Sequence, residues 1–204
     1  MKLKTSLAAI AAISAACAMP AFAQDAGTSA EGGQTEKKSD DAGFYAGAGI
    51  SVFFIDKDLA ASNLPISFVD QPSPAAFMGR IGYAFNKHFA VEVEAGIGGA
   101  SSDFGSGDNT WGNIGIGHAA GVHAVVTAPI GGGYYLLGKA GYQTFTIERE
   151  YFNYDVADIT ADGAAFSVGA GSRSGSMDYR LEYAIQSADG GNNGVLGLSI
   201  LKHF

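Results

Sequence analysis

Residues 194–204, GVLGLSILKHF, decide the fold class because their side chains alternate in character. One face carries Leu196, Leu198, Ile200, Lys202 and Phe204, and the other carries Val195, Gly197, Ser199, Leu201 and His203. A period of two predicts a β-strand, and about eleven residues in a tilted strand span the hydrocarbon layer of a membrane. The stretch is therefore either the closing strand of a membrane barrel or one strand of a soluble sheet.

The composition favours the membrane alternative. Charged residues make up 16% of the chain, whereas soluble domains carry about 25%. The chain holds 30 glycines, and no apolar run after its first residues is long enough for a membrane-spanning helix. Low charge, many glycines and many aromatics are typical of a membrane β-barrel. The formal net charge of −8 and the lack of a basic patch exclude a nucleic-acid partner.

The first 42 residues read as segments outside the folded domain. Residues 1–23 predict a secretory signal peptide: two lysines, a short apolar stretch and the cleavage site Ala21-Phe22-Ala23. A lipid-modified Cys17 is the weaker alternative. Residues 24–42 contain no large apolar side chain, so they predict a disordered periplasmic spacer. Cleavage removes Lys2 and Lys4 and takes the net charge from −8 to −10.

From Gly43 onward, seven further alternating segments precede the closing strand. They cover residues 43–54, 75–85, 89–98, 113–128, 134–147, 164–172 and 177–187. The connections between them are alternately long and short, with polar links at 99–112 and 148–163. This asymmetry predicts an all-β fold over 43–204, an eight-stranded antiparallel up-and-down transmembrane β-barrel. Both chain ends then lie on the short-turn side, in the periplasm.

The two faces of the predicted strands differ in a way that assigns their surroundings. Large apolar residues share one face, and glycines, serines and charged residues share the other, which predicts lipid outside and a polar lumen inside. The predicted interior charges are Arg80, Glu92, Glu94, Lys139, Arg180 and Glu182. An eight-stranded barrel is only wide enough to be filled by side chains. We therefore expect these residues to form a plug of ion pairs, with a selectivity lining for a small pore as the alternative.

The sequence gives no catalytic, cofactor-binding or metal-binding motif. The glycine-rich runs precede no helix pattern, and the four histidines show no metal-ligand spacing. On strict alternation His123 points inward and His118 toward lipid, but a bulge near Gly117 or Gly121 would bring both inside. The acidic 148–163 connection predicts a solvated loop. The apolar stretch Leu64–Val69 predicts either loop packing or a contact surface.

With the barrel laid out, the chain resembles the small outer-membrane β-barrel family of opacity-type surface antigens, the outer membrane protein A transmembrane domain and outer membrane protein X. The carriers are the eight strands, the alternation of 89–97, the segment Lys139-Ala-Gly-Tyr142 and the terminal Phe204. The resemblance implies that the barrel-assembly machinery reads Phe204 as an assembly signal. Lys202 departs from the aromatic or aliphatic residue usual at its position.

The predicted function is structural or surface-interactive in the outer membrane of a Gram-negative bacterium. The expected partners are membrane lipid, lipopolysaccharide, the assembly machinery and a host or cell-surface ligand bound through the loops. A narrow porin-like channel is the alternative. A lipid-active enzyme is disfavoured because no His-x-Ser pattern occurs.

Overall fold

The computed structural model describes residues 42–62, 71–106, 109–152, 154–188 and 191–204. The expected signal peptide, the spacer up to residue 41 and the Leu64–Val69 stretch lie outside the described residues. The described elements are β1 (Gly43–Phe54), α2 (Lys57–Ala61), β2 (Ala75–Ala84), β3 (Phe89–Ala100), β4 (Ser102–Ser106), β5 (Asn109–Gly131), β6 (Tyr134–Tyr151), β7 (Tyr154–Ser174), β8 (Met177–Ala188) and β9 (Gly191–His203). No described helix is long and apolar enough to cross a membrane.

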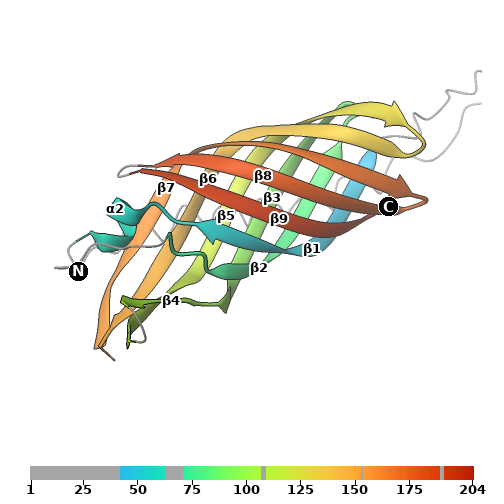
Figure 1. Cartoon of the computed structure of the whole chain (residues 1–204). Helices are drawn as coiled ribbons and strands as arrows, with labels where there is room; N and C mark the ends of the chain where they lie inside the picture. The colour runs from blue at the N-terminus through green and yellow to red at the C-terminus, as the bar shows by residue number, and fades with distance from the viewer. Residues whose placement is uncertain (1–41, 63–70, 107–108, 153, 189–190) are drawn as a thin grey trace, which may run out of the picture. The chain divides into compact units, whose positions relative to one another are not determined.

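One antiparallel sheet closes on itself to form the barrel (Figure 1). The strand order is β3-β2-β1-β9-β8-β7-β6-β5-β4, and an additional pairing of β3 with β5 completes the ring. The short β4 pairs only with β5 and lies outside the ring. Eight strands therefore form the barrel wall, which confirms the predicted fold class. The closing strand β9 pairs with β8 and with β1, because full closure leaves no unpaired edge within the membrane.

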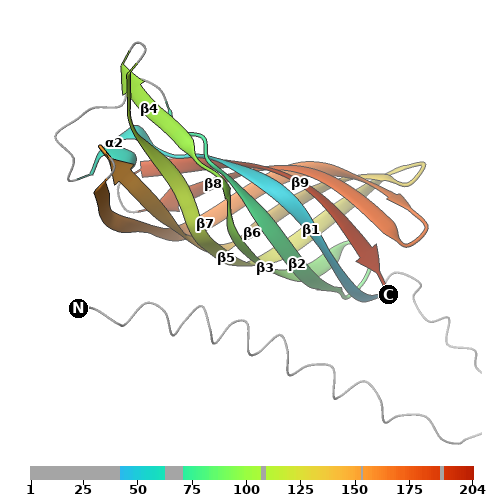
Figure 2. The same ribbon diagram turned by 90° about the horizontal axis from the view of Figure 1, so that it is seen from below.

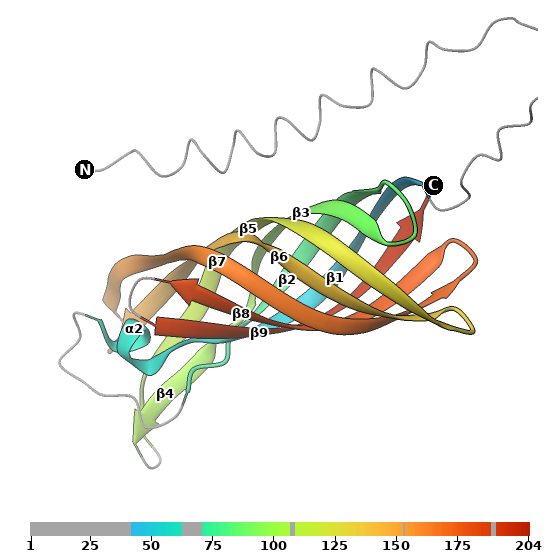
Figure 3. The same cartoon turned by 90° about the horizontal axis from the view of Figure 1, so that it is seen from above.

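The two ends of the barrel differ in their connections. The C-terminus lies at the end that holds the β2–β3, β5–β6 and β7–β8 turns, which we call the turn end (Figure 3). These turns use Gly131, Gly132, Gly133 and Gly175, whose φ angles are all positive, a region that glycine enters without steric cost. The helix α2 and the short strand β4 lie at the opposite end, which we call the loop end (Figure 2).

Two predicted polar connections are strands in the structure. Residues 148–163 belong to the end of β6 and the start of β7, and residues 99–112 hold the end of β3, β4 and the start of β5. The alternation of apolar and polar residues identifies a strand only where its two faces meet different surroundings. Beyond the membrane both faces meet water, so these segments carry acidic residues and read as loops.

The fourth predicted strand contains a β-bulge that reverses its alternation. Ile116 pairs with Ile147 and Ala119 pairs with Phe145, so Gly117 and His118 together oppose one residue of β6. The bulge places Ile116, like Ile114 before it, in the lumen, which corrects the prediction that both face lipid. The bulge does not bring both histidines inside, contrary to the alternative that the sequence left open: His118 stays on the outer face and His123 points inward.

The lumen has two chemically different halves. Toward the turn end it is lined by charged and polar side chains, as the alternation predicts. Toward the loop end it holds a buried apolar cluster, so the prediction of a polar lumen throughout is wrong. This apolar cluster consists of Phe53, Ile55, Leu59, Ala60, Ala76, Met78, Ile114, Ile116, Ala119, Phe145, Ile147, Ala161 and Val195. The outer wall between the turn and loop ends is apolar, with exposed residues such as Ile50, Ile81, Leu136, Val168 and Leu198.

Candidate functional site

The turn-end half of the lumen holds a linked set of ion pairs centred on Glu92. The Glu92 carboxylate pairs with Lys139 and, at 2.9 Å, with Nη1 of Arg180. The Tyr45 hydroxyl donates to the same carboxylate at 3.0 Å, and the Arg180 guanidinium lies 5.0 Å from the centroid of the Tyr45 ring. Glu92 is fully buried. It therefore joins β1, β3, β6 and β8 across the lumen.

Glu182 extends these contacts toward β2. Its Oε2 lies 2.6 Å from Nζ of Lys139, and its Oε1 lies 2.6 Å from Nη1 of Arg80. Nε of Arg80 is 3.3 Å from Oε2 of Glu94, whose Oε1 is 3.0 Å from Nε2 of His123. The structure thus brings all six sequence-predicted interior residues into one set of contacts.

Asp178, together with its partner Arg173, is missing from the predicted interior set. It is fully buried, it pairs with Nη2 of Arg180 at 3.0 Å, and it accepts a hydrogen bond from the Tyr135 hydroxyl. Arg173 at 3.6 Å and His203 at 3.2 Å contact the same carboxylate. Asp178 lies two residues before Arg180, so strict alternation along β8 places both on the inner face. That parity was the available signal, since Asp178 lies within the predicted strand 177–187, but the predicted interior set does not include it.

The charges in this lumen are balanced once Asp178 and Arg173 are included. We call Arg80, Glu92, Glu94, Lys139, Arg173, Asp178, Arg180 and Glu182 the lumen network. Four carboxylates face four permanent cations. Burying a charge without a partner costs roughly several kcal/mol, and each cation of the network has a carboxylate partner on another strand. The network therefore favours one strand register, although its net contribution to stability is small.

Two tyrosines frame the lumen network in matching ways. Tyr45 packs against Gly82 of β2, and Tyr135 packs against Gly171 of β7. A Cβ atom at Gly82 would lie 2.1 Å from Cζ of Tyr45, and one at Gly171 would lie 2.2 Å from Cζ of Tyr135. Only glycine leaves room for the ring at these two positions. Both tyrosines are therefore held where their hydroxyls reach carboxylates of the network.

The apolar cluster is covered at the loop end by α2. The helix begins after Asp56, whose Oδ1 accepts from the backbone N–H of Asp58 at 2.9 Å. Its Leu59 and Ala60 are buried in the apolar cluster. The backbone N–H of Asp56 donates to Oδ1 of Asn193 at 3.0 Å, which ties the start of the helix to β9.

Arg149 fastens the other end of α2. Its Nη1 donates to the carbonyl of Ser62 at 2.6 Å and to that of Ala60 at 3.3 Å. Its Nη2 donates to the carbonyl of Ala157 on β7 at 2.5 Å. The side chain is buried and makes no ion pair among the described residues. One guanidinium thus joins the helix to β6 and β7.

Beyond the ring, β4, β5, β6 and β7 continue as a four-stranded sheet, which we call the protruding sheet. Pairing of β3 with β5 ends at Ile97 and His118, and pairing of β7 with β8 begins only at Gly163. Residues 154–162 of β7 therefore extend past the last β7–β8 pair for about 30 Å, at about 3.3 Å per residue, although Ala161 among them still packs in the apolar cluster. Among the described residues no strand pairs with them on the side away from β6.

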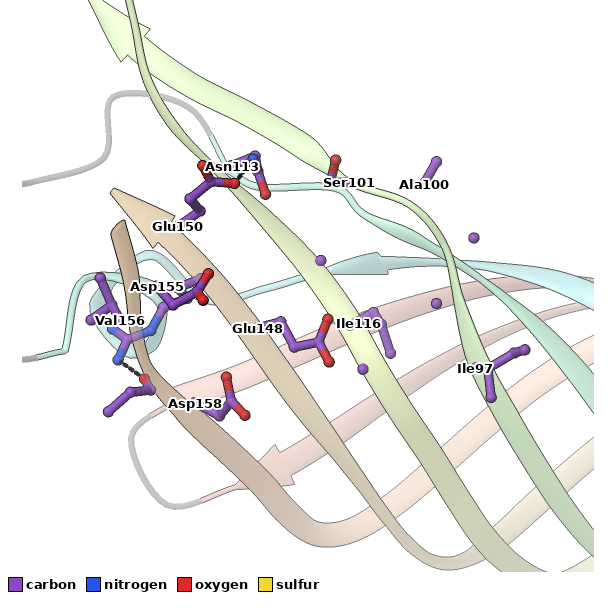
Figure 4. Close-up of a pocket in the computed structure, with 16 residues that line it drawn as sticks. Ile97, Ala100, Ser101, Asn113, Ile116, Glu148, Glu150, Asp155, Val156 and Asp158 are labelled. Carbon is purple, nitrogen blue, oxygen red and sulfur yellow. Dashed lines mark hydrogen bonds between the residues drawn. The ribbon is translucent and has the colours of Figure 1, made fainter. Parts of the chain in front are cut away.

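One face of the protruding sheet is hollow and acidic (Figure 4). The hollow measures about 800 Å³ and lies between the end of β3, β5, β6 and β7. The carboxylates of Glu148, Glu150, Asp155 and Asp158 gather along it. Nδ2 of Asn113 donates to Oε2 of Glu150 at 2.8 Å. The sequence prediction of a solvated acidic segment agrees with the exposure of Glu148, Asp155 and Asp158, though its backbone is a hairpin.

The histidines lie far apart and have different partners. His123 contacts Glu94, His203 contacts Asp178, His118 contacts the Thr146 hydroxyl at 3.1 Å, and Nδ1 of His88 lies 3.0 Å from the carbonyl of Thr127. Within the described part of the chain, no group of three or more His, Cys, Asp or Glu side chains is placed to hold a metal ion.

Comparison with known structures supports the fold. The chain is similar to Ail, the attachment invasion locus protein of Yersinia pestis, crystallised with the heparin analogue sucrose octasulfate: 14% identity, 80% of this chain, 99% of that chain, TM-score 0.54. It is also similar to Neisserial surface protein A (14% identity, 79% and 97% coverage, TM-score 0.53). The N-terminal β-barrel domain of Pseudomonas aeruginosa OprF gives 13% identity, 80% and 98% coverage and a TM-score of 0.52.

A family comparison extends over nearly the whole chain. Curated protein sequences give no match. The family described as "Outer membrane protein beta-barrel domain" matches residues 8–204. The apolar outer wall, the closed eight-stranded ring and this match agree with one another. The chain therefore belongs to the outer membrane protein β-barrel domain family, whose members lie in the lipid of the Gram-negative outer membrane.

Proposed function

We propose that this protein is a non-enzymatic surface-interaction protein whose protruding sheet contacts a partner outside the cell. The observation that carries the proposal is the extension of β4–β7 beyond the ring as a sheet with exposed side chains on both faces. A barrel that served only to fill the membrane would not need this extension. Exposed strands on a rigid scaffold are a common way to present a binding surface.

The proposal includes an orientation. The loop end faces the exterior, and the turn end with both chain termini faces the periplasm. The expected signal peptide at 1–23 and the spacer at 24–42 fit this arrangement, because they would leave the folded chain on the periplasmic side. Protease treatment of intact cells tests the orientation. Cleavage within 148–162 is expected, and cleavage confined to the turns near His88 and Gly175 would contradict it.

A narrow channel is the second candidate because the turn-end half of the lumen is charged. The packing of side chains in the lumen argues against an open channel. The lumen network and the apolar cluster fill successive levels of the lumen, and α2 packs on the apolar cluster at the loop end. The space beside Arg80, Glu94 and Lys139 measures only about 30 Å³, roughly the volume share of one water molecule. Planar-bilayer recording of the refolded protein tests this point. Steady conductance abolished by substitution of Arg80 or Arg180 would favour the channel.

A lipid-active enzyme is the third candidate and rests on no catalytic geometry among the described residues. Unchanged mass spectra of lipid A after overexpression are expected.

The surface-interaction proposal also includes contacts with lipopolysaccharide and recognition of Phe204 by the barrel-assembly machinery. Adhesion tests the main role: a non-adherent laboratory strain that displays the chain should bind cultured epithelial monolayers better than the same strain carrying an empty vector.

A further inference from the structure

The tip of the β6–β7 hairpin has an unusual backbone. Phe152 has a φ of +50°, and it is the single non-glycine residue with positive φ among the described residues. A bulky side chain in this region is a conformational outlier, and glycine or asparagine would adopt it at lower cost. Such strain persists where surrounding structure enforces it, and it clusters at functional positions. The aromatic ring at Phe152 therefore needs an explanation other than turn geometry.

Neighbouring groups hold this strained tip in one conformation. The backbone N–H of Phe152 donates to the carbonyl of Trp111 at 2.7 Å. The Phe152 ring packs edge-on against Tyr151 at 4.6 Å, and Tyr151 lies parallel to Phe104 of β4 at 6.3 Å. The aromatic contacts thus run from the tip back into the protruding sheet. They fix the direction in which Phe152 points.

The aromatic side chains of Phe152 and Tyr154 at the tip are nonetheless exposed to solvent. Phe152 is 55% exposed and Tyr154 is 76% exposed, and both stand at the far end of a sheet that already projects from the ring. Two large exposed aromatic side chains, of which Phe152 is held in place by its contacts, are unfavourable in water. Rigid aromatic side chains are the residues that contribute most to protein–protein binding, because few torsions are lost when they enter a pocket.

The charges beside the tip define the chemistry of the partner. Glu150 and Asp155 flank the two rings, and Asp103 and Asp158 lie on the same protruding sheet. Lys57 and the buried Arg149 are the cations that the described residues place at this end. A bilayer with anionic headgroups would be repelled by these carboxylates. A protein surface with basic groups would be attracted.

We propose that Phe152 and Tyr154 are the anchor of the surface interaction and insert into an apolar pocket on a partner protein, where basic side chains at the pocket rim pair with Glu150 and Asp155. This inference rests on the proposed function and names the partner chemistry at that same sheet. It assigns the apolar contact to the hairpin tip and the charge complementarity to the flanking carboxylates.

Phe152→Gly separates this role from a structural one. Glycine removes the ring and accepts the positive φ, so the melting temperature of the refolded barrel should stay unchanged or rise. Adhesion of the displaying strain to epithelial monolayers should fall at least about tenfold, as expected for loss of an aromatic anchor. Phe152→Tyr is the matched control and should keep adhesion. A drop in melting temperature with unchanged adhesion would show that the ring is structural and would overturn the proposal.

The class of partner is tested with two further surfaces. On monolayers treated with trypsin before the assay, the strain displaying the wild-type chain should adhere no better than the empty-vector strain. Phosphatidylcholine vesicles with and without phosphatidylglycerol should bind wild type and Phe152→Gly equally. Undiminished binding to shaved cells, or vesicle binding that depends on Phe152, would replace the protein partner with a membrane and overturn the inference.

A double variant tests the contribution of the Glu150 and Asp155 carboxylates. Glu150→Gln combined with Asp155→Asn should weaken adhesion and reduce its dependence on salt. Equal adhesion of wild type and Phe152→Gly would remove the tip from the binding surface and leave the proposed function in place. Failure of wild type to adhere above vector would remove both.

Discussion

The two halves of the lumen are both filled by side chains, but one half is charged and the other is apolar. Both must fill the interior of an eight-stranded ring, which is too narrow to stay open. The turn-end half does so with the lumen network, whose members come from β2, β3, β6, β7 and β8. The loop-end half uses aliphatic and aromatic side chains and is completed by α2.

Ion pairs and apolar packing constrain the strand register to different degrees. Ion pairs are directional and costly when mismatched, so a strand shifted by one residue would bury unpaired charges. Apolar packing tolerates more rearrangement, which suits the end where the chain leaves the membrane and must admit a helix from a loop. The half that sets the register is therefore polar, and the half that joins the wall to the protruding sheet is apolar.

Breaking the polar half at its centre should have the largest effect. Glu92→Gln keeps the shape of the side chain but leaves Lys139 and Arg180 short of a carboxylate. We expect a loss of about 4 kcal/mol in the free energy of unfolding, because breaking a buried ion pair from one side costs about 3–5 kcal/mol. Urea unfolding in lipid vesicles, followed by gel migration of unboiled samples, measures it.

An exposed pair provides the control for Glu92. The Tyr142 hydroxyl donates to Asp162 on the outside of the barrel, and Asp162→Asn should cost less than about 1 kcal/mol. Equal losses from the two substitutions would mean that burial does not strengthen the lumen network. The ion pairs in the polar half would then contribute no more to the free energy of unfolding than an exposed hydrogen bond does.

Breaking the apolar half should come next. Phe145 is fully buried and meets Phe53 edge-on at 5.0 Å. Phe145→Ala should cost about 3 kcal/mol through lost burial and the cavity left behind. The loss should be insensitive to salt when it is measured by the same unfolding assay, because no charge is removed. Phe145→Leu, which fills more of the space, should recover most of the stability.

Loosening the cover of the apolar half should have a smaller and local effect. Arg149→Ala removes the donors to the carbonyls of Ala60, Ser62 and Ala157, and we expect about 1–2 kcal/mol of lost stability. Trypsin cleavage after Lys57 should become faster. Arg149→Lys keeps the charge but not the planar fork, so it should be nearly as susceptible. Unchanged cleavage in both variants would show that α2 is held by its apolar contacts alone.

The smallest effect on stability is expected where the chain touches neither half. Phe204 is 75% exposed on the outer wall at the turn end, and its backbone N–H donates to the carbonyl of Phe44 at 2.9 Å. Phe204→Ala should change the unfolding free energy by less than about 1 kcal/mol. The yield of assembled barrel in cells should fall much more. Equal yields would mean that the terminal aromatic residue is not an assembly signal.

The strands within the membrane could be predicted from sequence because lipid and lumen impose different requirements on alternate residues. The observed β1 has the predicted bounds, and the closing strand turns Leu196, Leu198 and Ile200 outward while Ser199 is buried. The same parity pointed Arg80, Glu92 and Lys139 inward. Along these segments each residue reports its own surroundings, so no knowledge of distant contacts is needed.

Three features could not be decided by that reasoning because they depend on contacts between distant residues. The bulge at Gly117 and His118 follows from how β5 meets β6, and it moves Ile114 and Ile116 to the lumen. The helix α2 is short and is held by Arg149 and by apolar side chains from several strands.

The protruding sheet was the third feature, and it shows the limit most clearly. Outside the membrane both faces of a strand meet water, so the acidic residues from Glu148 to Asp162 carry no alternation. The sequence alone determined that the chain is an eight-stranded membrane barrel, because lipid on one face and the lumen on the other require different side chains at alternate positions of each strand. Pairing across the sheet decided the chemistry of the loop-end lumen and the exposed aromatic tip at Phe152, because those positions are set by neighbours that the linear order does not reveal.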